Sequence, residues 1–157
     1  MIFDATDRIP FGMIKSTYSL LAKMYKLNSP EDFSLPTYDS FDDFIKEDII
    51  ENAHILIYQK GMKAVGCVYL NNYEYLNEKF YKNENGCMKI SNLYVLDEYR
   101  HKGIATKLLK RAEEIAKEEG VFSIASSYFD DNKASETLHK KNGYKVIKTE
   151  IQVIKDI

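Results

Sequence analysis

Cysteine is scarce in this chain of 157 residues, which contains only Cys67 and Cys87. The two cysteines have no paired spacing and no partner histidines nearby, so the sequence indicates neither a disulfide framework nor a zinc site. We therefore expect no metal. A chain of this length can bury one hydrophobic core without such cross-links, and we expect a single domain over residues 1–157.

A strong charge imbalance and long apolar runs are also absent. The formal net charge is −2, which gives no general attraction to phosphate backbones, so we expect no nucleic acid partner. The start, Met1 to Asp4, lacks the basic and apolar regions of a signal peptide, and no later run approaches membrane-spanning length. These absences predict a cytoplasmic protein without a membrane partner, whose ligand is small or cationic.

The hydrophobic pattern predicts an alternation of helices and strands. An opening strand over 1–6 precedes a helix near 12–26 and a second helix capped by Asp39 and Ser40. The runs 55–58 and 64–70 form a predicted antiparallel hairpin, followed by an extended loop or strand ends over 71–86. The predicted elements after this loop are strand 88–95, a helix from Gly103 to Gly120, strand 121–128, a helix from Asn132 to Gly143, and strand 144–154. This order predicts an α/β fold with a mixed central sheet flanked by helices.

The most informative stretch is the turn from Asp97 to Thr106, between a predicted strand and a predicted helix. The start of a helix carries unpaired backbone N–H groups and the positive end of the helix dipole, which together suit a pyrophosphate. Gly103 and Ala105 keep the approach open, Arg100 and Lys102 add positive charge, and Thr106 adds a hydroxyl. The ending of a Walker loop and the three-glycine dinucleotide fingerprint are both missing. The alternative is a turn whose glycine serves only the chain geometry.

This turn resembles the cofactor loop of the GNAT superfamily of acyl-CoA N-acyltransferases, Arg/Gln-x-x-Gly-x-Gly/Ala, at Arg100, Gly103 and Ala105. The preceding segment 93–100 resembles the family's central strand, where a bulge presents backbone groups to the pantetheine arm. A later pattern of the family is matched by Asn132, Leu138, His139, Lys141, Gly143 and Tyr144. The resemblance is close over residues 88–147 and only architectural before them.

The resemblance implies an acetyl-CoA-dependent N-acetyltransferase that acts on a primary amine of a small molecule, peptide or protein. It implies a GNAT-like domain, acetyl-CoA as co-substrate, and a homodimer. The implied pantetheine contacts are Tyr94 and Val95, and Asn132 would also contact the cofactor. The implied pyrophosphate contacts are the backbone groups of Arg100, His101, Lys102, Gly103, Ile104, Ala105 and Thr106.

The implied catalytic residue is His139, which stands where many relatives carry a tyrosine that protonates the departing thiolate. A histidine can donate a proton at neutral pH, so this role can survive the substitution. The alternative is a helix-surface histidine without a catalytic duty. Tyr128 or Tyr144 could line the acyl pocket.

The proton acceptor for the amine is left open by the sequence. Relatives often carry a carboxylate on the central strand at the positions of Lys89 and Ser91, neither of which can replace it. Water, Glu74, Asp39 or Tyr73 could act instead. The missing carboxylate motivates a second hypothesis, a non-catalytic acyl-CoA-binding regulatory module. The acidic residues that would suit a cationic amine, or form only a solvated face, are Glu31, Asp32, Asp39, Asp42 and Asp43.

Overall fold

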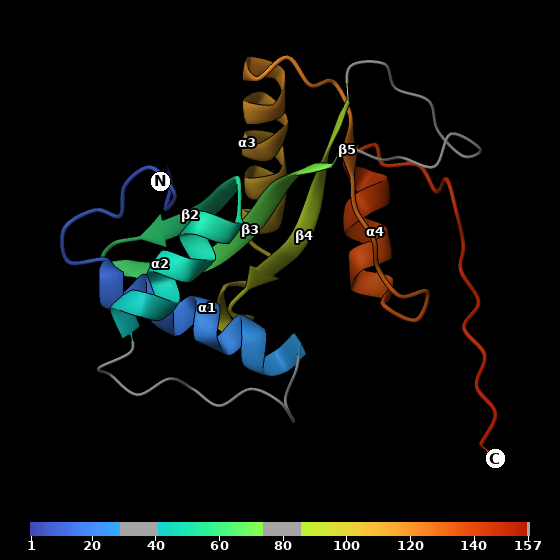
Figure 1. The fold of residues 1–157 in the computed structure, drawn as a ribbon, viewed down its shortest axis with the longest axis horizontal. Coiled ribbons are helices and arrows are strands. Elements are labelled where there is room, and N and C mark those ends of the chain that lie inside the picture. The colour runs from blue at the N-terminus through green and yellow to red at the C-terminus, as the bar shows by residue number, and fades with distance from the viewer. Residues whose placement is uncertain (29–40, 74–85, 157) are drawn as a thin grey trace.

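The computed structural model describes residues 1–28, 41–73 and 86–156. Four α-helices and a five-stranded sheet are found in these ranges, which confirms the predicted α/β fold with a mixed sheet (Figure 1). The elements follow in the order β1 (Ile2–Asp4), α1 (Ile14–Asn28), α2 (Phe41–Glu51), β2 (His54–Lys60), β3 (Lys63–Tyr73), β4 (Cys87–Val95), the 3₁₀ turn η2 (Asp97–Tyr99), α3 (Ile104–Glu118), β5 (Ile124–Ala125) and α4 (Lys133–Lys141).

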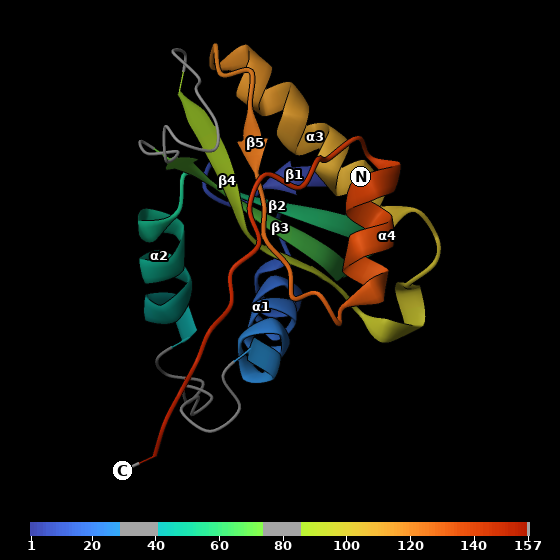
Figure 2. The same cartoon turned by 90° about the vertical axis from the view of Figure 1, so that its right-hand side faces the viewer.

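The strands lie in sequence order across the sheet. β1, β2, β3 and β4 pair antiparallel with their neighbours, and β5 pairs parallel with β4. Residues 64–70 of β3 are all buried, as expected for a central strand that is covered on both faces. Figure 2 shows the reason, because α1 and α3 lie on opposite sides of the sheet.

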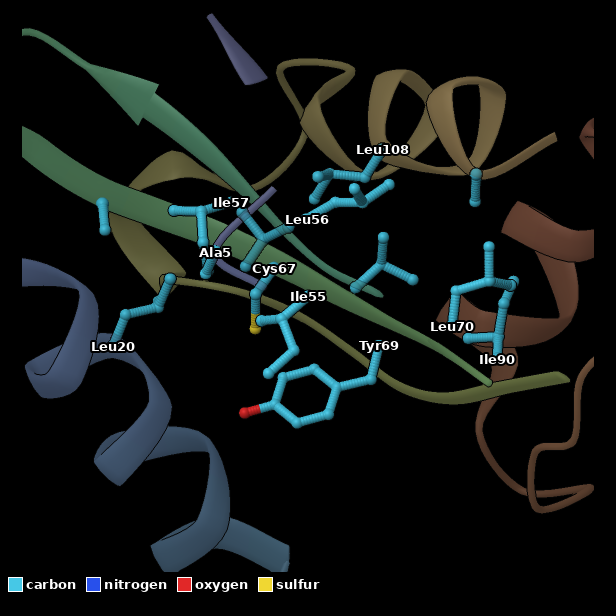
Figure 3. Packing of buried hydrophobic residues seen from close by; sticks show 14 of the residues in the cluster. Ala5, Leu20, Ile55, Leu56, Ile57, Cys67, Tyr69, Leu70, Ile90 and Leu108 are labelled. Carbon is cyan, nitrogen blue, oxygen red and sulfur yellow. The ribbon is translucent and has the colours of Figure 1, made fainter. Parts of the chain in front are cut away.

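The core joins these two helices through the sheet. Leu20 of α1 approaches from one side and Leu108 of α3 from the other, with Leu56 and Cys67 between them (Figure 3). Gly66 of β3 allows the close approach of α3, because a Cβ at this position would lie 3.1 Å from the side chain of Ile104. The first turn of α3 is therefore held directly against the sheet beside β4.

Two predicted strands near the C-terminus are wrong in extent or in kind. The predicted strand 121–128 is reduced to Ile124–Ala125, and residues 144–156 form no regular element where a strand over 144–154 was expected. Strand propensity describes how well side chains fit a pleated surface, and it needs a neighbouring strand to act on. In the structure the C-terminal segment extends away from the sheet (Figure 1). The segment expected to form an extended loop or strand ends begins as strand, because β3 continues to Tyr73 by pairing with β4.

Candidate active site

The turn between β4 and α3 places a run of backbone N–H groups at the start of α3. Gly103 is the N-cap residue with φ of 75°, and no side-chain cap hydrogen bond is made there. The N–H of Lys107 donates to the carbonyl of Gly103 at 3.1 Å, so the amides of residues 104–106 precede the first helical hydrogen bond. A Cβ built on Gly103 would meet no atom within 4 Å. This helix start is open to an anion, as predicted for the pyrophosphate.

The basic side chains of the turn also support its shape. Arg100 Nε donates to the carbonyl of Val95 at 3.0 Å, and its Nη2 lies 2.9 Å from the Asp97 carboxylate. Lys102 Nζ donates to the carbonyl of Glu98 at 2.9 Å. The side chains of Arg100 and Lys102 therefore hold the turn together while they keep positive charge near the start of α3.

Two other predicted contact residues connect local elements. Asn132 caps α4 by accepting a hydrogen bond from the Ser135 N–H at 3.0 Å, which confirms the predicted cap. Thr106 Oγ1 accepts a hydrogen bond from Asn142 Nδ2 at 3.4 Å, which joins α3 to the end of α4. His101 is exposed and adopts φ of 58° in the turn. The cofactor contacts of these residues stay predictions.

The N–H of Val95 points toward the side of β4 on which β5 lies. Leu96 N–H donates to the carbonyl of Val65 at 2.9 Å, and the alternation of antiparallel pairs then turns the Val95 N–H away from β3. β5 pairs with β4 only at Met88 and Lys89, and the two strands separate beyond this point (Figure 1). The Val95 N–H is thus available at the edge of β4, whereas the backbone groups of Tyr94 point toward β3 and the Val95 carbonyl accepts from Arg100. The pantetheine contacts expected of Tyr94 and Val95 stay predictions.

A bulge accompanies this edge, but it lies earlier than expected. The register of β3 with β4 passes from Tyr69 opposite Asn92 to Leu70 opposite Ile90, so Ser91 is the extra residue. Asn71 Nδ2 donates to the Ser91 hydroxyl at 3.2 Å. The resemblance placed the bulge within 93–100, whereas the register shift comes before Leu93.

His139 is buried, with 5% of its surface exposed, so its interpretation as a helix-surface histidine is wrong. Its Nδ1 lies 2.7 Å from the carbonyl oxygen of Ser135, and its Nε2 lies 2.8 Å from Ser126 Oγ. The rings of Tyr128 and Tyr144 lie 4.9 and 5.1 Å from the imidazole. The end of β5 and both flanks of α4 thus hold the ring in one orientation.

Tyr144 contributes packing at this place. Burial raises the pKa of Tyr144 to about 12, with a smaller effect from Glu113 on α3. Its hydroxyl is buried and has no hydrogen-bond partner among the described residues, while its ring packs against the hydrophobic core. Tyr144 therefore faces the core between α3 and α4. A place in the acyl pocket, which the sequence suggested for Tyr128 or Tyr144, stays a prediction.

Among the expected proton acceptors, Asp39 and Glu74 lie outside the described residues. Tyr73 ends β3, with Lys89 Nζ 5.3 Å from its ring centre. The structure adds a carboxylate that sequence reasoning missed, because Asp48 of α2 is buried and accepts hydrogen bonds from Tyr25 Oη at 2.5 Å and from Tyr69 Oη. Burial raises the pKa of Asp48 although both tyrosines stabilise its charge. These contacts bind α2 to α1 and β3.

Of the expected acidic group, Glu31, Asp32 and Asp39 also lie outside the described ranges, and Asp43 is exposed. Across residues 1–28, 41–73 and 86–156, no group of three histidine, cysteine, aspartate or glutamate side chains could hold a metal ion. None of the helices in these ranges is long and apolar enough to cross a bilayer.

Known proteins similar to this chain identify its family. A profile of the acetyltransferase (GNAT) family matches residues 18–144. Aminoglycoside N(6')-acetyltransferase type 1 from Acinetobacter genomosp. 13 is 30% identical over 95 residues, which cover 60% of this chain and 63% of that protein. The match therefore spans less than two thirds of the relative's length.

The fold agrees with two solved structures. AAC(6')-Iy in complex with the bisubstrate analogue CoA-S-monomethyl-acetylneamine superposes with a TM-score of 0.75 at 16% identity, covering 100% of this chain and 98% of that one. The apo aminoglycoside antibiotic 6'-N-acetyltransferase AAC(6')-IG from Acinetobacter haemolyticus gives a TM-score of 0.70 at 20% identity, with 100% and 99% covered. These matches confirm the predicted fold, and the profile confirms the acetyl-CoA-dependent N-acetyltransferase class at the level of the family. The chain belongs to the acetyltransferase (GNAT) family.

Proposed function

We propose that this protein transfers the acetyl group of acetyl-CoA to the 6'-amine of an aminoglycoside. The proposed use of acetyl-CoA rests on the start of α3. There Gly103 leaves uncapped N–H groups open to a phosphate, beside the edge of β4. The acceptor is inferred from the relative that is named for aminoglycoside 6'-N-acetylation.

Acetyl-CoA fits the described residues in two places. The amides that follow Gly103 would bind the pyrophosphate, with Arg100 and Lys102 adding positive charge at the same turn. The pantetheine arm would lie along the edge of β4 beside Tyr94 and Val95. His101 and Asn132 lie at the ends of the helices that border this region. Acetyl-CoA supplies the acetyl thioester that the acceptor amine attacks.

The chemistry assigned to the chain is direct transfer. The amine must be unprotonated, since an ordinary alkylamine has a pKa of about 10.4. Attack forms the C–N bond, and the Val95 N–H, which points away from β3, would donate to the oxyanion that develops. Loss of the thiolate breaks the C–S bond and requires a proton, for which His139 is the proposed source.

A cationic acceptor suits the charge of the protein. The net charge is −2, and Asp43 and Glu47 are exposed on α2, so a polycationic amine meets no general repulsion at the surface. An aminoglycoside carries several such amines. The charge of the protein therefore supports a polycationic acceptor, while the position of the acetylated amine is inferred from the relative alone.

The test compares two aminoglycosides that differ at one group. Neomycin carries an amine at the 6' position, and paromomycin carries a hydroxyl there. We expect time-dependent release of the CoA thiol from acetyl-CoA with neomycin and at most slow release with paromomycin. Equal rates with both would contradict 6' transfer. Tight acetyl-CoA binding without release, across these compounds and simple polyamines, would favour the non-catalytic module.

We also propose that the protein is a homodimer. The C-terminal segment over 144–156 supports this proposal, because it exposes Val146, Ile147, Ile151, Val153 and Ile154 without a neighbouring strand among the described residues. Such a run of exposed aliphatic side chains is unfavourable in water and is typical of a surface that a partner covers.

A further inference from the structure

The hydrogen bonds of His139 define how its ring can carry protons. Nδ1 lies 2.7 Å from the Ser135 carbonyl oxygen and 3.2 Å from the Ser135 hydroxyl. A carbonyl oxygen can only accept, so the shorter contact favours a proton on Nδ1. A neutral ring therefore accepts the Ser126 hydroxyl at Nε2, and a protonated ring donates to Ser126 Oγ through the same 2.8 Å contact. The ring would have to break both hydrogen bonds to turn toward a substrate.

Ser126 is the accessible member of this pair. It directly follows β5, at the point where the pairing with β4 ends at Ala125. Ser126 is half-buried, whereas His139 is almost fully enclosed. Figure 2 shows the chain leaving β4 after β5 and continuing into α4. A ligand lying along the open edge of β4 would thus meet the Ser126 hydroxyl before the imidazole.

We propose that Ser126 is a catalytic residue that protonates the departing thiolate, with His139 as the positioning residue that resupplies its proton. This inference rests on the proposed function. When the ring is protonated, its Nε2–H donates to Ser126 Oγ and leaves the serine O–H available to the sulfur. As the C–S bond breaks, the sulfur takes the serine proton and Ser126 Oγ takes the Nε2 proton. The proton that the amine loses restores the ring through water, so one proton moves in net from nitrogen to sulfur.

The central experiment is a double-mutant cycle in single-turnover acetyl transfer at saturating acetyl-CoA and neomycin. We expect Ser126→Ala and His139→Phe each to lower the rate by about 10²-fold, within the range of general acid catalysis. The double variant should be no slower than His139→Phe, because both residues act through one proton path. Affinity for acetyl-CoA, measured by calorimetry, should stay within about twofold of the unsubstituted protein.

Matched variants distinguish this proton relay through Ser126 and His139 from an effect of the substitutions on packing. Ser127→Ala removes a hydroxyl from the exposed neighbouring serine and should leave the rate unchanged. Ser126→Thr keeps a hydroxyl and should recover most of the loss. Two protons move together in the relay, so a plot of the rate of the unsubstituted protein against the fraction of D₂O should be curved. His139→Phe, which keeps the serine but removes the second proton, should give a straight line.

Each outcome decides between named alternatives. A Ser126→Ala variant with the full single-turnover rate overturns the relay, and so does a double variant whose loss is the product of the two single losses. Weaker acetyl-CoA binding with an unchanged rate at saturation assigns Ser126 to packing. Absence of turnover in the unsubstituted protein, with every amine, overturns the proposed function itself and the relay with it.

Discussion

Gly103 and Gly120 stand at the two ends of α3 with nearly equal backbone angles, φ of 75° and 76°. A Cβ on either residue would meet nothing within 4 Å, so glutamate costs similar backbone strain at both, about 1 kcal/mol. Only at position 103 does the carboxylate compete with a pyrophosphate for the N–H groups of the helix start. We expect Gly103→Glu to weaken acetyl-CoA binding by more than about tenfold in calorimetry, and Gly120→Glu to leave it within about twofold.

Equal weakening by the two substitutions would assign the effect to strain in α3. Unchanged binding by a folded Gly103→Glu variant would place the pyrophosphate elsewhere. Circular dichroism of both variants establishes whether they fold.

The sequence predicted the position of His139 but not its surroundings. The spacing from Asn132 through His139 to Gly143 located it on the last helix. Its burial depends on Ser126 and Tyr128, which lie in an irregular segment where no periodic pattern marks the facing residues. Asp48 was missed for a similar reason, because its partners Tyr25 and Tyr69 come from two other elements and only packing brings the three together.

At the scale of elements, His54 joins β2 to β1 and to the C-terminal end of α3. Its Nδ1 lies 2.6 Å from the Asp4 carboxylate and its Nε2 lies 2.6 Å from the Glu119 carboxylate. Burial lowers the pKa of His54, but the hydrogen bonds to Asp4 and Glu119 outweigh it and raise the pKa above 6.5. A pKa raised by folding stabilises the protein below the unfolded value, and this stabilisation is lost as pH rises through the folded value.

We therefore expect the free energy of unfolding to fall as the pH rises from below 6.5 through the raised pKa of His54. His54→Gln should remove this fall and should cost about 1 kcal/mol at the acidic end, as expected for partly exposed charged hydrogen bonds. Urea unfolding at a series of pH values measures both effects. Glu119→Gln should remove part of the dependence, and His101→Gln, at an exposed histidine, none of it. An unchanged pH profile in His54→Gln would assign the dependence to another group.

Element prediction succeeded where the residue pattern reflects contacts within the chain. α3 begins after Gly103 and ends before Gly120, as expected from its apolar stripe and flanking glycines. The hairpin of β2 and β3 also matched, because β-rich apolar runs and a tight turn at Gly61 are local signals. The run over 144–154 has strand propensity but pairs with no strand in the part of the chain that the structure describes, and no local pattern reports whether a partner exists.

For the whole molecule, the proposed site is built from elements that follow residue 86. β4, the turn that follows it, the start of α3 and the N-cap of α4 supply every predicted contact residue for acetyl-CoA, and the close resemblance covered the same part of the sequence. α1 and α2 precede it, and the resemblance there was only architectural. The sequence could therefore predict the family and the acetyl-CoA residues, whereas the acceptor had to be inferred from a relative. A single domain over residues 1–157 stays a prediction.

The C-terminal segment over 144–156 is the basis of our prediction for the homodimer. With a period of two, Ile147, Thr149, Ile151 and Val153 share one face of an extended chain. Two copies paired antiparallel about Thr149 would place Ile147 opposite Ile151 and Lys148 opposite Glu150 of the other copy. This twofold pairing matches an isoleucine with an isoleucine and a positive with a negative side chain, and it gives a partner to Ile151, whose side chain is 86% exposed. Val153 falls opposite Lys145 of the other copy.

We expect sedimentation analysis to show a dimer that Ile151→Lys weakens by more than about 100-fold, because each dimer loses two buried isoleucines at about 1.5–3 kcal/mol apiece. Gln152→Lys adds the same charge to the opposite face of the strand and should have a much smaller effect. Lys148→Glu should weaken the dimer by placing glutamate opposite Glu150, and Lys148→Glu with Glu150→Lys should restore it, because the exchange of charges returns an opposite pair. A monomer at all concentrations would reject the homodimer. A dimer insensitive to Ile151→Lys would reject this pairing, because the pairing places residue 151 directly opposite Ile147 of the other copy.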